Sequence, residues 1–412
     1  MRGRISFLVL IFISSWSFAQ SIATSPYSIY GLGSLYESNF GLTAAMGMSG
    51  IALPSEEFIN NKNAASLTNI PEHHFIFEVG GTGIQASFES NLKKEQRNNF
   101  QFSHFAFAFP INSKSAFSLA LMPYSSSSFK VSDLEIPIID SNNENYYLDV
   151  IGTGGLNNLD FSYAYRFGSK LSFGLSASVL FGNITDDRTF TIGNSITNIT
   201  KEVSYRGIRP ILSSQFKMTP SLTLGLNVKS PTRVNATKIQ SVTVSNNSGT
   251  IDLETDEQSD TDDFYLPFDF GIGANKSFAN NKFNLSLDYE KSFWESTNQS
   301  AMYGSFADQE KFSLGFSYQK NKVSRSYLDR IKFATGIHYD SGYLMLNKNK
   351  IDDKSFSIGA SLPLDRLSSA LFISYSYGTK GQVSNTLIQE NYHKLTLNLN
   401  LNSVWFVKRR LE

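Results

Sequence analysis

Residues 171–181 read Leu-Ser-Phe-Gly-Leu-Ser-Ala-Ser-Val-Leu-Phe, and this stretch decides the fold class. Large apolar residues such as Phe173 and Leu175 alternate with Ser172, Gly174 and Ser176. A period of two is typical of a β-strand, because successive side chains point to opposite faces. The stretch therefore predicts a strand with one apolar face and one face of very small side chains.

The same alternation recurs along the chain, in residues 222–229, 283–290, 312–319 and 395–402. In each case the polar set is rich in Ser, Gly, Asn and Thr. Charged residues make up 17% of the chain and aromatic residues 14%, whereas soluble domains carry roughly a quarter charged residues. The pattern favours strands whose apolar face meets lipid; a secreted β-sandwich is the alternative.

The N-terminus has the features of an export signal. Arg2 and Arg4 precede an apolar stretch at residues 5–13, and Ser17 and Ala19 are small residues at the cleavage-site positions. We expect residues 1–19 to be a signal peptide, with a retained anchor as the alternative. Export together with alternating strands predicts a transmembrane antiparallel β-barrel of the bacterial outer membrane, an all-β fold in contact with membrane lipid.

The connections between the predicted strands differ in length. We count about fourteen strands within a barrel domain at residues 72–412. Short turns such as 112–114 and 168–170 alternate with long polar connections such as 187–201 and 235–262. Outer-membrane barrels have short periplasmic turns and long external loops, so an even strand number predicts that both termini are periplasmic.

Two strands contain interruptions that we interpret as kink candidates. Gly152, Gly154 and Gly155 lie inside the fourth predicted strand, and glycines there often mark bends or bulges. In the second strand the polar set gives way near His104 to apolar residues in the same register. Either a bulge changes the face there or part of the lumen is apolar; an ordinary aromatic girdle is the third interpretation.

Residues 20–71 precede the first strand and are apolar, Gly-rich and poor in charge. Such a composition is not typical of a disordered tether. The box Asn63-Ala64-Ala65-Ser66-Leu67 predicts a short helix with an Asn cap. We expect this segment to be a hatch inside the barrel lumen, where the small residues of strands such as 171–181 leave room.

Three motifs resemble the FadL/TodX outer-membrane transport family, and in particular its Bacteroidota branch, which includes PorV-like members. They are Ser25-Pro-Tyr-Ser-Ile-Tyr-Gly-Leu-Gly33, Ala45-Met-Gly-Met-Ser-Gly-Ile-Ala52 and the 63–67 box, in which Ala64 replaces the usual Pro. The C-terminal Trp405-Phe-Val-Lys-Arg409 is similar to that branch as well. The departure at Ala64 weakens the helix-start signal.

The resemblance implies uptake of hydrophobic compounds, of the fatty-acid or hydrocarbon class, by diffusion past the hatch. A hydrophobic small molecule would then contact Tyr27, Tyr30, Met46, Met48 and Ile51, with the 63–67 box as a structural lock. The alternative is a non-transporting accessory barrel of the type IX secretion system that binds another outer-membrane protein or client proteins. Fold alone does not choose between these functions.

Motifs for other functions are weak. None of the five His lies in His-Glu-x-x-His, and there is no Gly-x-Ser-x-Gly, so we predict no enzyme, no cofactor and no metal site. The acidic stretch 252–263 could bind Ca²⁺, but its spacing matches no EF-hand and a solvated loop is the alternative. The formal net charge of zero gives no indication of nucleic-acid binding.

Overall fold

The computed structural model describes residues 25–91, 93–137, 145–301, 304–365, 369–384 and 387–404. The predicted signal peptide and the tail at residues 405–409 lie outside the described residues. Within the described part of the chain, no helix has the length and apolar character needed to cross a membrane.

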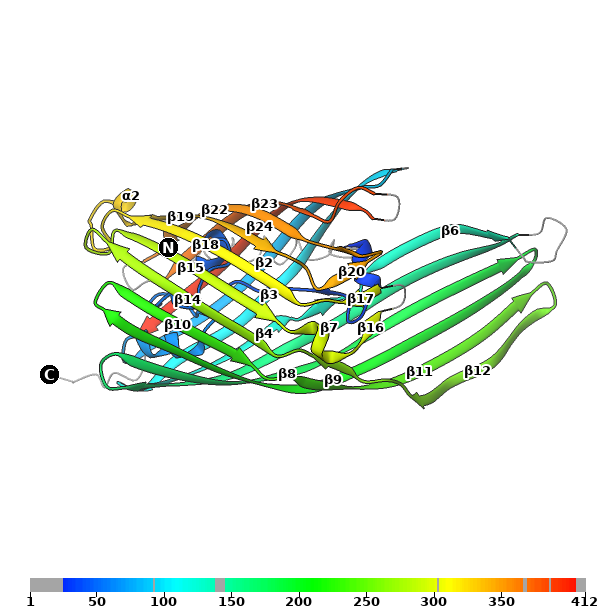
Figure 1. The fold of residues 1–412 in the computed structure, drawn as a ribbon, viewed down its shortest axis with the longest axis horizontal. Coiled ribbons are helices and arrows are strands. Elements are labelled where there is room, and N and C mark those ends of the chain that lie inside the picture. Colours follow the sequence, from blue (N-terminus) through cyan, green and yellow to red (C-terminus); the bar gives the residue numbers. More distant parts are fainter. Residues whose placement is uncertain are drawn as a thin grey trace, which may run out of the picture.

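The described chain forms a closed antiparallel barrel of fourteen strands, as predicted (Figure 1). Three of these strands are interrupted and therefore carry two or three labels each. The wall consists of β2 (His74–Glu89), β3 (Lys94–Asn112), β4 and β6 (Ser115–Pro123, Phe129–Pro137), β7 (Asn145–Phe167), β8 (Leu171–Ile192), β9 (Ser195–Thr219), β10 and β11 (Leu222–Lys229, Thr232–Asn246), β12, β13 and β14 (Gly249–Asp260, Phe264–Leu266, Asp269–Phe278), β15 (Phe283–Ser292), β18 (Gln309–Gln319), β19 (Lys332–Asp340), β22 (Asp353–Pro363), β23 (Ala370–Lys380) and β24 (Gln389–Val404).

The remaining elements are short. A helix, α2, lies in the turn after β18, and a small sheet and one 3-10 helix lie among the connections at the other end (Figure 1). These elements are α2 (Tyr327–Arg330), η5 (Trp294–Thr297), β16 (Ser300–Ala301), β17 (Gly304–Phe306), β20 (Leu344–Leu346) and β21 (Asn349–Lys350). The N-terminal segment, residues 25–71, contains η2 (Pro26–Ile29), β1 (Ser34–Leu35), η3 (Thr43–Ala45) and η4 (Ala64–Asn69).

The first and last strands close the wall. β2 pairs with β24 along its whole length, from His74 opposite Val404 to Glu89 opposite Gln389. This pairing places the start of β2 and the end of β24 on the same rim. Closure satisfies backbone groups that a sheet edge would expose to lipid.

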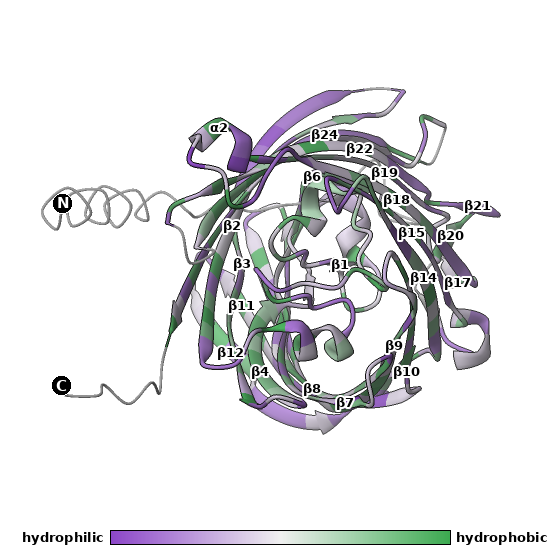
Figure 2. Ribbon diagram, turned by 90° about the vertical axis from the view of Figure 1, so that its left-hand side faces the viewer, coloured by the Kyte–Doolittle hydropathy of each residue, from purple (hydrophilic) through white to green (hydrophobic). Residues whose placement is uncertain are grey.

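The two faces of β8 agree with the alternation in its sequence. Phe173 and Leu175 are 50% and 54% exposed on the outside of the wall. Ser172, Ser176 and Ser178 are buried on the inside. Figure 2 shows part of the N-terminal segment, including β1, inside the ring of strands. Small side chains on the inner face thus leave space for polypeptide.

The long external loops predicted at 187–201 and 235–262 are wrong: most of these residues continue the strands. β8 and β9 have 22 and 25 residues, whereas β10 has 8. The outer parts of β6, β7, β8, β9, β11 and β12 therefore stand beyond the rest of the wall on one side (Figure 1). We call this six-stranded region, residues 129–137, 145–152, 184–203 and 236–260, the outer blade.

The third strand of the wall bends inward between β4 and β6. There β5 (Ser125–Ser126) pairs with β1 of the N-terminal segment and not with a wall strand. Backbone hydrogen bonds still join the bend to β7. Tyr124 N–H donates to the Leu156 carbonyl at 2.8 Å, and Ser127 N–H donates to the Gly154 carbonyl at 3.0 Å. The bend is thus connected to the wall on one side and to the N-terminal segment on the other.

The kink candidates lie at and near this bend. A Cβ on Gly155 would come within 2.2 Å of the Ser125 carbonyl oxygen, so only glycine allows this approach. Gly152 provides space for the ring of Phe129. In β3 the register shifts by one residue at Ser103, next to His104, and the His104 ring is buried beneath Phe40 at 3.7 Å between ring centroids.

Candidate functional site in the barrel lumen

The 63–67 box begins the 3-10 helix η4 and fixes it against the wall. The Asn63 side chain caps η4 by accepting from Ala65 N–H at 3.0 Å, and its amide donates to the carbonyls of Ile51 and Ser214 at 2.8 and 2.9 Å. A Cβ on Gly174 would come within 2.5 Å of the Ala65 nitrogen. The predicted short helix with an Asn cap is therefore present, and wall glycine allows its close approach. Ala64, Ser66 and Leu67 complete the box, and of these Ser66 and Leu67 are buried.

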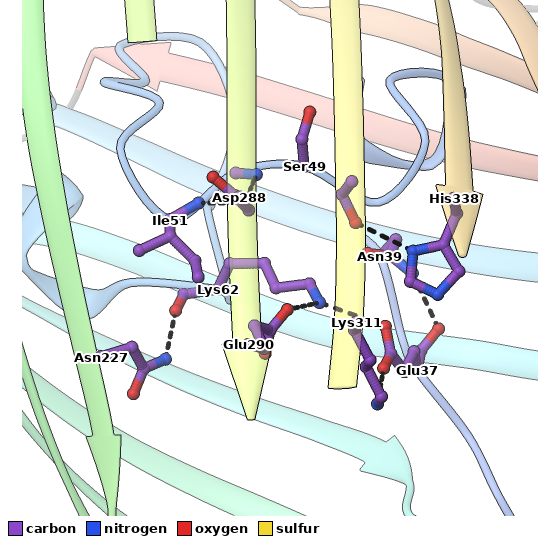
Figure 3. Close-up of polar contacts among 12 residues, drawn as sticks. Glu37, Asn39, Ser49, Ile51, Lys62, Asn227, Asp288, Glu290, Lys311 and His338 are labelled. Carbon is purple, nitrogen blue, oxygen red and sulfur yellow. Dashed lines mark hydrogen bonds and ion pairs between the residues drawn. The ribbon is translucent and has the colours of Figure 1, made fainter. Parts of the chain in front are cut away.

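A carboxylate of the wall holds the middle of the N-terminal segment. The Asp288 side chain accepts hydrogen bonds from the N–H groups of Gly50 and Ile51 at 2.6 and 2.9 Å (Figure 3). Ile51 is fully buried and lies against Gly225 and Gly273 of the wall. Charge-assisted hydrogen bonds of this kind are about twice as strong as neutral ones, so Asp288 fastens the backbone itself.

The turn after η3 touches the opposite side of the wall with its backbone. Gly47 N–H donates to the Ser357 hydroxyl at 3.0 Å, and that hydroxyl donates to the Ala45 carbonyl at 2.9 Å. A Cβ on Gly336 would come within 2.2 Å of the Gly47 nitrogen. Met46, which precedes this turn, is fully buried. At Gly47 the backbone of the turn is therefore in direct contact with the wall.

A network of buried ions joins the segment to β15 and β18. Lys62 lies 3.1 Å from both Glu37 and Glu290, and Glu37 also pairs with Lys311 (Figure 3). Burial disfavours the charge on Glu37, but Lys311 and Lys62 outweigh burial and hold the pKa of the Glu37 carboxyl well below its usual range. Burial likewise opposes the Lys62 charge, but Glu290 and Glu37 raise its pKa. Glu37 and Lys62 are therefore charged at neutral pH.

A second ion cluster lies beside the turn that contains α2. Glu57 pairs with Lys322 at 2.8 Å and with Lys332 at 2.9 Å, whereas its neighbour Glu56 is 63% exposed and lies 3.7 Å from Lys322. Burial opposes the Glu57 charge, but Lys332 and Lys322 outweigh it and lower the pKa of Glu57 to about 2. This cluster fastens the segment at the rim where the turns are short.

The start of the segment is tied to β24 and to the inward bend. The Tyr27 hydroxyl donates to the Ile388 carbonyl at 2.6 Å and accepts from Ile388 N–H at 3.1 Å. Burial raises the pKa of Tyr27 to about 12. The Ser127 hydroxyl of the bend donates to the Ser28 carbonyl of the segment at 3.1 Å. The segment is thus held around the circumference of the lumen.

Two cavities of about 240 and 190 Å³ lie beside the segment. Both include charged side chains in their lining. Those of the first include Glu37, Lys311, His338, Lys380, Glu390 and Lys394, and those of the second include Asp160, Arg209, Lys229, Asp269 and Glu290. Apolar residues such as Leu35 also line both cavities, so each lining is mixed and its charged side chains interrupt an apolar path.

The five predicted ligand contacts are not gathered around one cavity. Tyr27 and Met48 line the first cavity, whereas Met46 and Ile51 are fully buried against the wall. Tyr30 packs against a buried cluster that includes Leu156 and Leu266. Their role in binding a hydrophobic molecule stays a prediction.

Sequence reasoning missed the ionic and polar anchors. Asp288, Glu290 and Lys311 occupy the polar positions of alternating strands, and no local signal identified their partners. Among the described residues, no group of three metal-ligating side chains is close enough to hold an ion. The acidic residues at 252–260 belong to β12 and not to a loop.

Comparison with solved structures assigns the fold. The CymD monoaromatic hydrocarbon channel superposes with a TM-score of 0.62 at 16% identity, covering 87% of this chain and 96% of that one. The toluene transporter TbuX of Ralstonia pickettii gives 0.59 at 18% identity, with 88% and 98% covered. The toluene transporter TodX of Pseudomonas putida gives 0.62 at 14% identity, with 90% and 98% covered. Comparison with curated proteins gives no match.

The fold class is therefore that of these barrels. Within this class the chain belongs to the BamG family, whose model matches residues 1–412.

Proposed function

We propose that this chain is a non-transporting barrel of the bacterial outer membrane, with both termini in the periplasm, that acts by binding another outer-membrane protein. The observation that carries the proposal is the filled lumen. Asp288, Asn63 and the Glu37–Lys62 network fasten residues 25–71 to several sides of the wall. We infer that this segment is a seal.

A hydrophobic solute would meet charged side chains on this route. Its driving force is partition into apolar surroundings, and both cavities include buried charges in their lining. Opening the lumen would require the Lys62–Glu290 and Lys311–Glu37 pairs to separate, which leaves uncompensated buried charges at a cost of several kcal/mol. Binding through the surface requires no such opening. The type IX secretion system of Bacteroidota is the assembly that the resemblance in residues 25–52 suggests for the partner.

Transport of hydrophobic compounds is the second candidate. The inward bend at residues 124–128 favours it, because a bent strand can provide a lateral exit from the lumen. Under this candidate the segment is a hatch, Tyr27 and Met48 meet the solute in the first cavity, and the glycines 152, 154 and 155 allow the bend to move.

Purification from the native membrane in mild detergent tests the proposal. We expect one outer-membrane protein to co-purify at a fixed ratio across detergents, with no stoichiometric fatty acid or hydrocarbon in the mass spectrum. Membranes that lack the chain serve as the control for carry-over. A stoichiometric hydrophobic molecule without a protein partner would overturn the proposal in favour of transport.

A further inference from the structure

The inner face of the outer blade carries an apolar row that crosses all six strands. The row is defined by consecutive cross-strand pairs, so its members lie side by side on one face. It consists of Leu134, Leu148, Phe190, Thr197, Val244 and Ile251. The neighbouring row toward the barrel is mixed, and it consists of Val131, Val150, Arg188, Ile199, Val242 and Glu254.

This face points over the barrel mouth. Ile184, six residues before Phe190 and hence on the same face of β8, packs against the buried cluster that includes Leu156 and Leu180. The Tyr146 and Phe190 rings lie 6.1 Å apart, which confirms that β7 and β8 share the face. The opposite face carries polar pairs such as Thr189 with Asn198.

The polarity of the blade is therefore the reverse of that of the wall below it. In the lower part of β8 the apolar residues Phe173 and Leu175 point outward, whereas Phe190 and its row point inward. An outward polar face indicates that the blade stands in water above the lipid. Its apolar inner face consequently needs a cover other than lipid.

Among the described elements, η2 contacts β6, the edge strand of the blade, and no other helix or separate sheet is stacked on this face. Leu134 and Ile251 are 45% and 61% exposed. Six strands spaced by roughly 4.8 Å make a row about 24 Å wide. Contiguous apolar surfaces of this extent mark binding sites. An open sheet does not enclose a small molecule, since small-molecule sites bury most of the ligand surface, so a macromolecule fits it better.

We propose that the inner face of the outer blade binds an apolar polypeptide segment of a second protein outside the cell, a segment with acidic residues at its end toward the membrane. The acidic residues follow from Lys201 and Lys238, which lie on the same face toward the barrel. Asp186 lies opposite Lys201, but its carboxylate pairs with Arg188, and neither lysine forms an ion pair among the described residues. The proposal rests on the proposed function, and it adds that the partner protein binds on the extracellular side of the barrel.

A photo-reactive side chain introduced at Phe190, with Thr189 on the opposite face as the matched control, tests the proposal in intact cells. We expect position 190 to crosslink to one protein and position 189 to give none. Mass spectrometry should locate the crosslink in an apolar segment that contains Asp or Glu. Phe190→Asp should reduce recovery of that protein roughly tenfold, as for a central interface residue, and Thr189→Asp should not. Lys201→Glu should also weaken recovery.

Each other outcome overturns the proposal in a different way. A crosslink to a second copy of this chain indicates self-association, and an adduct of lipid size indicates a small hydrophobic ligand. Equal crosslinking from both faces indicates no defined site. If the Phe190→Asp and Val244→Asp variants both recover a partner in unchanged amount, the proposed function stands and the assignment of the partner to this surface is wrong. Folding of each variant is verified by gel electrophoresis: a folded barrel changes its migration on heating, and each variant should show the same change as the unchanged chain.

Discussion

Asp288 shows how one wall residue holds a segment that precedes it by 237 positions. Its carboxylate accepts from two backbone N–H groups, so it restrains the chain whatever the side chains at positions 50 and 51 are. The ion pairs of Lys62 act similarly on the next part of the segment. At this scale the seal consists of polar anchors, and the apolar residues fill the space between them.

Replacing Asp288 by Ala should loosen residues 46–53. Two buried N–H groups would lose their acceptor, at a cost of roughly 1–3 kcal/mol. Ser286→Ala is the matched control, because Ser286 is the neighbouring buried lumen residue of β15 and its hydroxyl has no hydrogen-bond partner in the described structure. Hydrogen exchange in detergent should accelerate at Gly50 and Ile51 only in Asp288→Ala. Equal exchange in both variants would show that Asp288 is not an anchor.

The Glu57 cluster predicts a dependence on pH. Because the Glu57 pKa is lowered from 4.5 to about 2, its contribution to stability is complete above the ordinary value and is lost as the pH falls through the folded-state value. At pH 7, Glu57→Gln should reduce the free energy of unfolding by roughly 1–3 kcal/mol. This range lies between the usual contribution of an exposed ion pair and the cost of breaking a buried one.

The difference between Glu57→Gln and the unchanged chain should shrink as the pH is lowered from about 5 toward 2. Urea unfolding in detergent at several pH values measures it. Glu56→Gln, in which the more exposed neighbour is changed, should stay close to the unchanged chain at every pH. A pH-independent deficit in Glu57→Gln would argue against ion pairing as the cause.

At the scale of elements, the alternation in β8, β15 and β18 was sufficient to predict a lipid-facing wall, because each strand reports its own two faces. The outer blade was not predicted. Its sequence at residues 187–201 contains four Thr, two Asn and Gly193, which indicates a loop when read locally. The strand persists because β7 and β9 pair with β8 along its full length. The length of this strand therefore depends on its pairing with the neighbouring strands. The ionic anchors depend on partners that are far apart in sequence.

Glycines of the wall determine how closely the N-terminal segment approaches. Gly336→Ala would place a Cβ within 2.2 Å of the Gly47 backbone, so the turn after η3 must shift, at about 1–3 kcal/mol. Gly83→Ala is the control, because its nearest neighbour lies 4.0 Å from the added Cβ. Thermal unfolding should show a lower transition for Gly336→Ala alone. Unchanged stability would indicate that the segment does not contact the wall there.

For the whole molecule, the fold of hydrocarbon channels does not by itself determine the function. The barrel that provides a channel in relatives is here filled by residues 25–71, whose charges are paired with the wall. The strand alternation correctly predicted the barrel, and the composition of residues 20–71, together with the resemblance, predicted a segment in its lumen. They could not show how the segment is held, because its anchors include contacts such as that between Glu37 and Lys311, 274 positions apart.

Solute uptake by intact cells tests the seal most directly. Thr68 and Ser172, whose hydroxyl oxygens lie 2.9 Å apart, can be changed together to Cys to lock η4 to β8, and the chain has no other cysteine. We expect the disulfide to form and toluene and long-chain fatty acid uptake to be the same in cells with the unchanged chain, the locked chain or neither. Saturable uptake that requires the chain and disappears on locking would contradict the account and establish a gate.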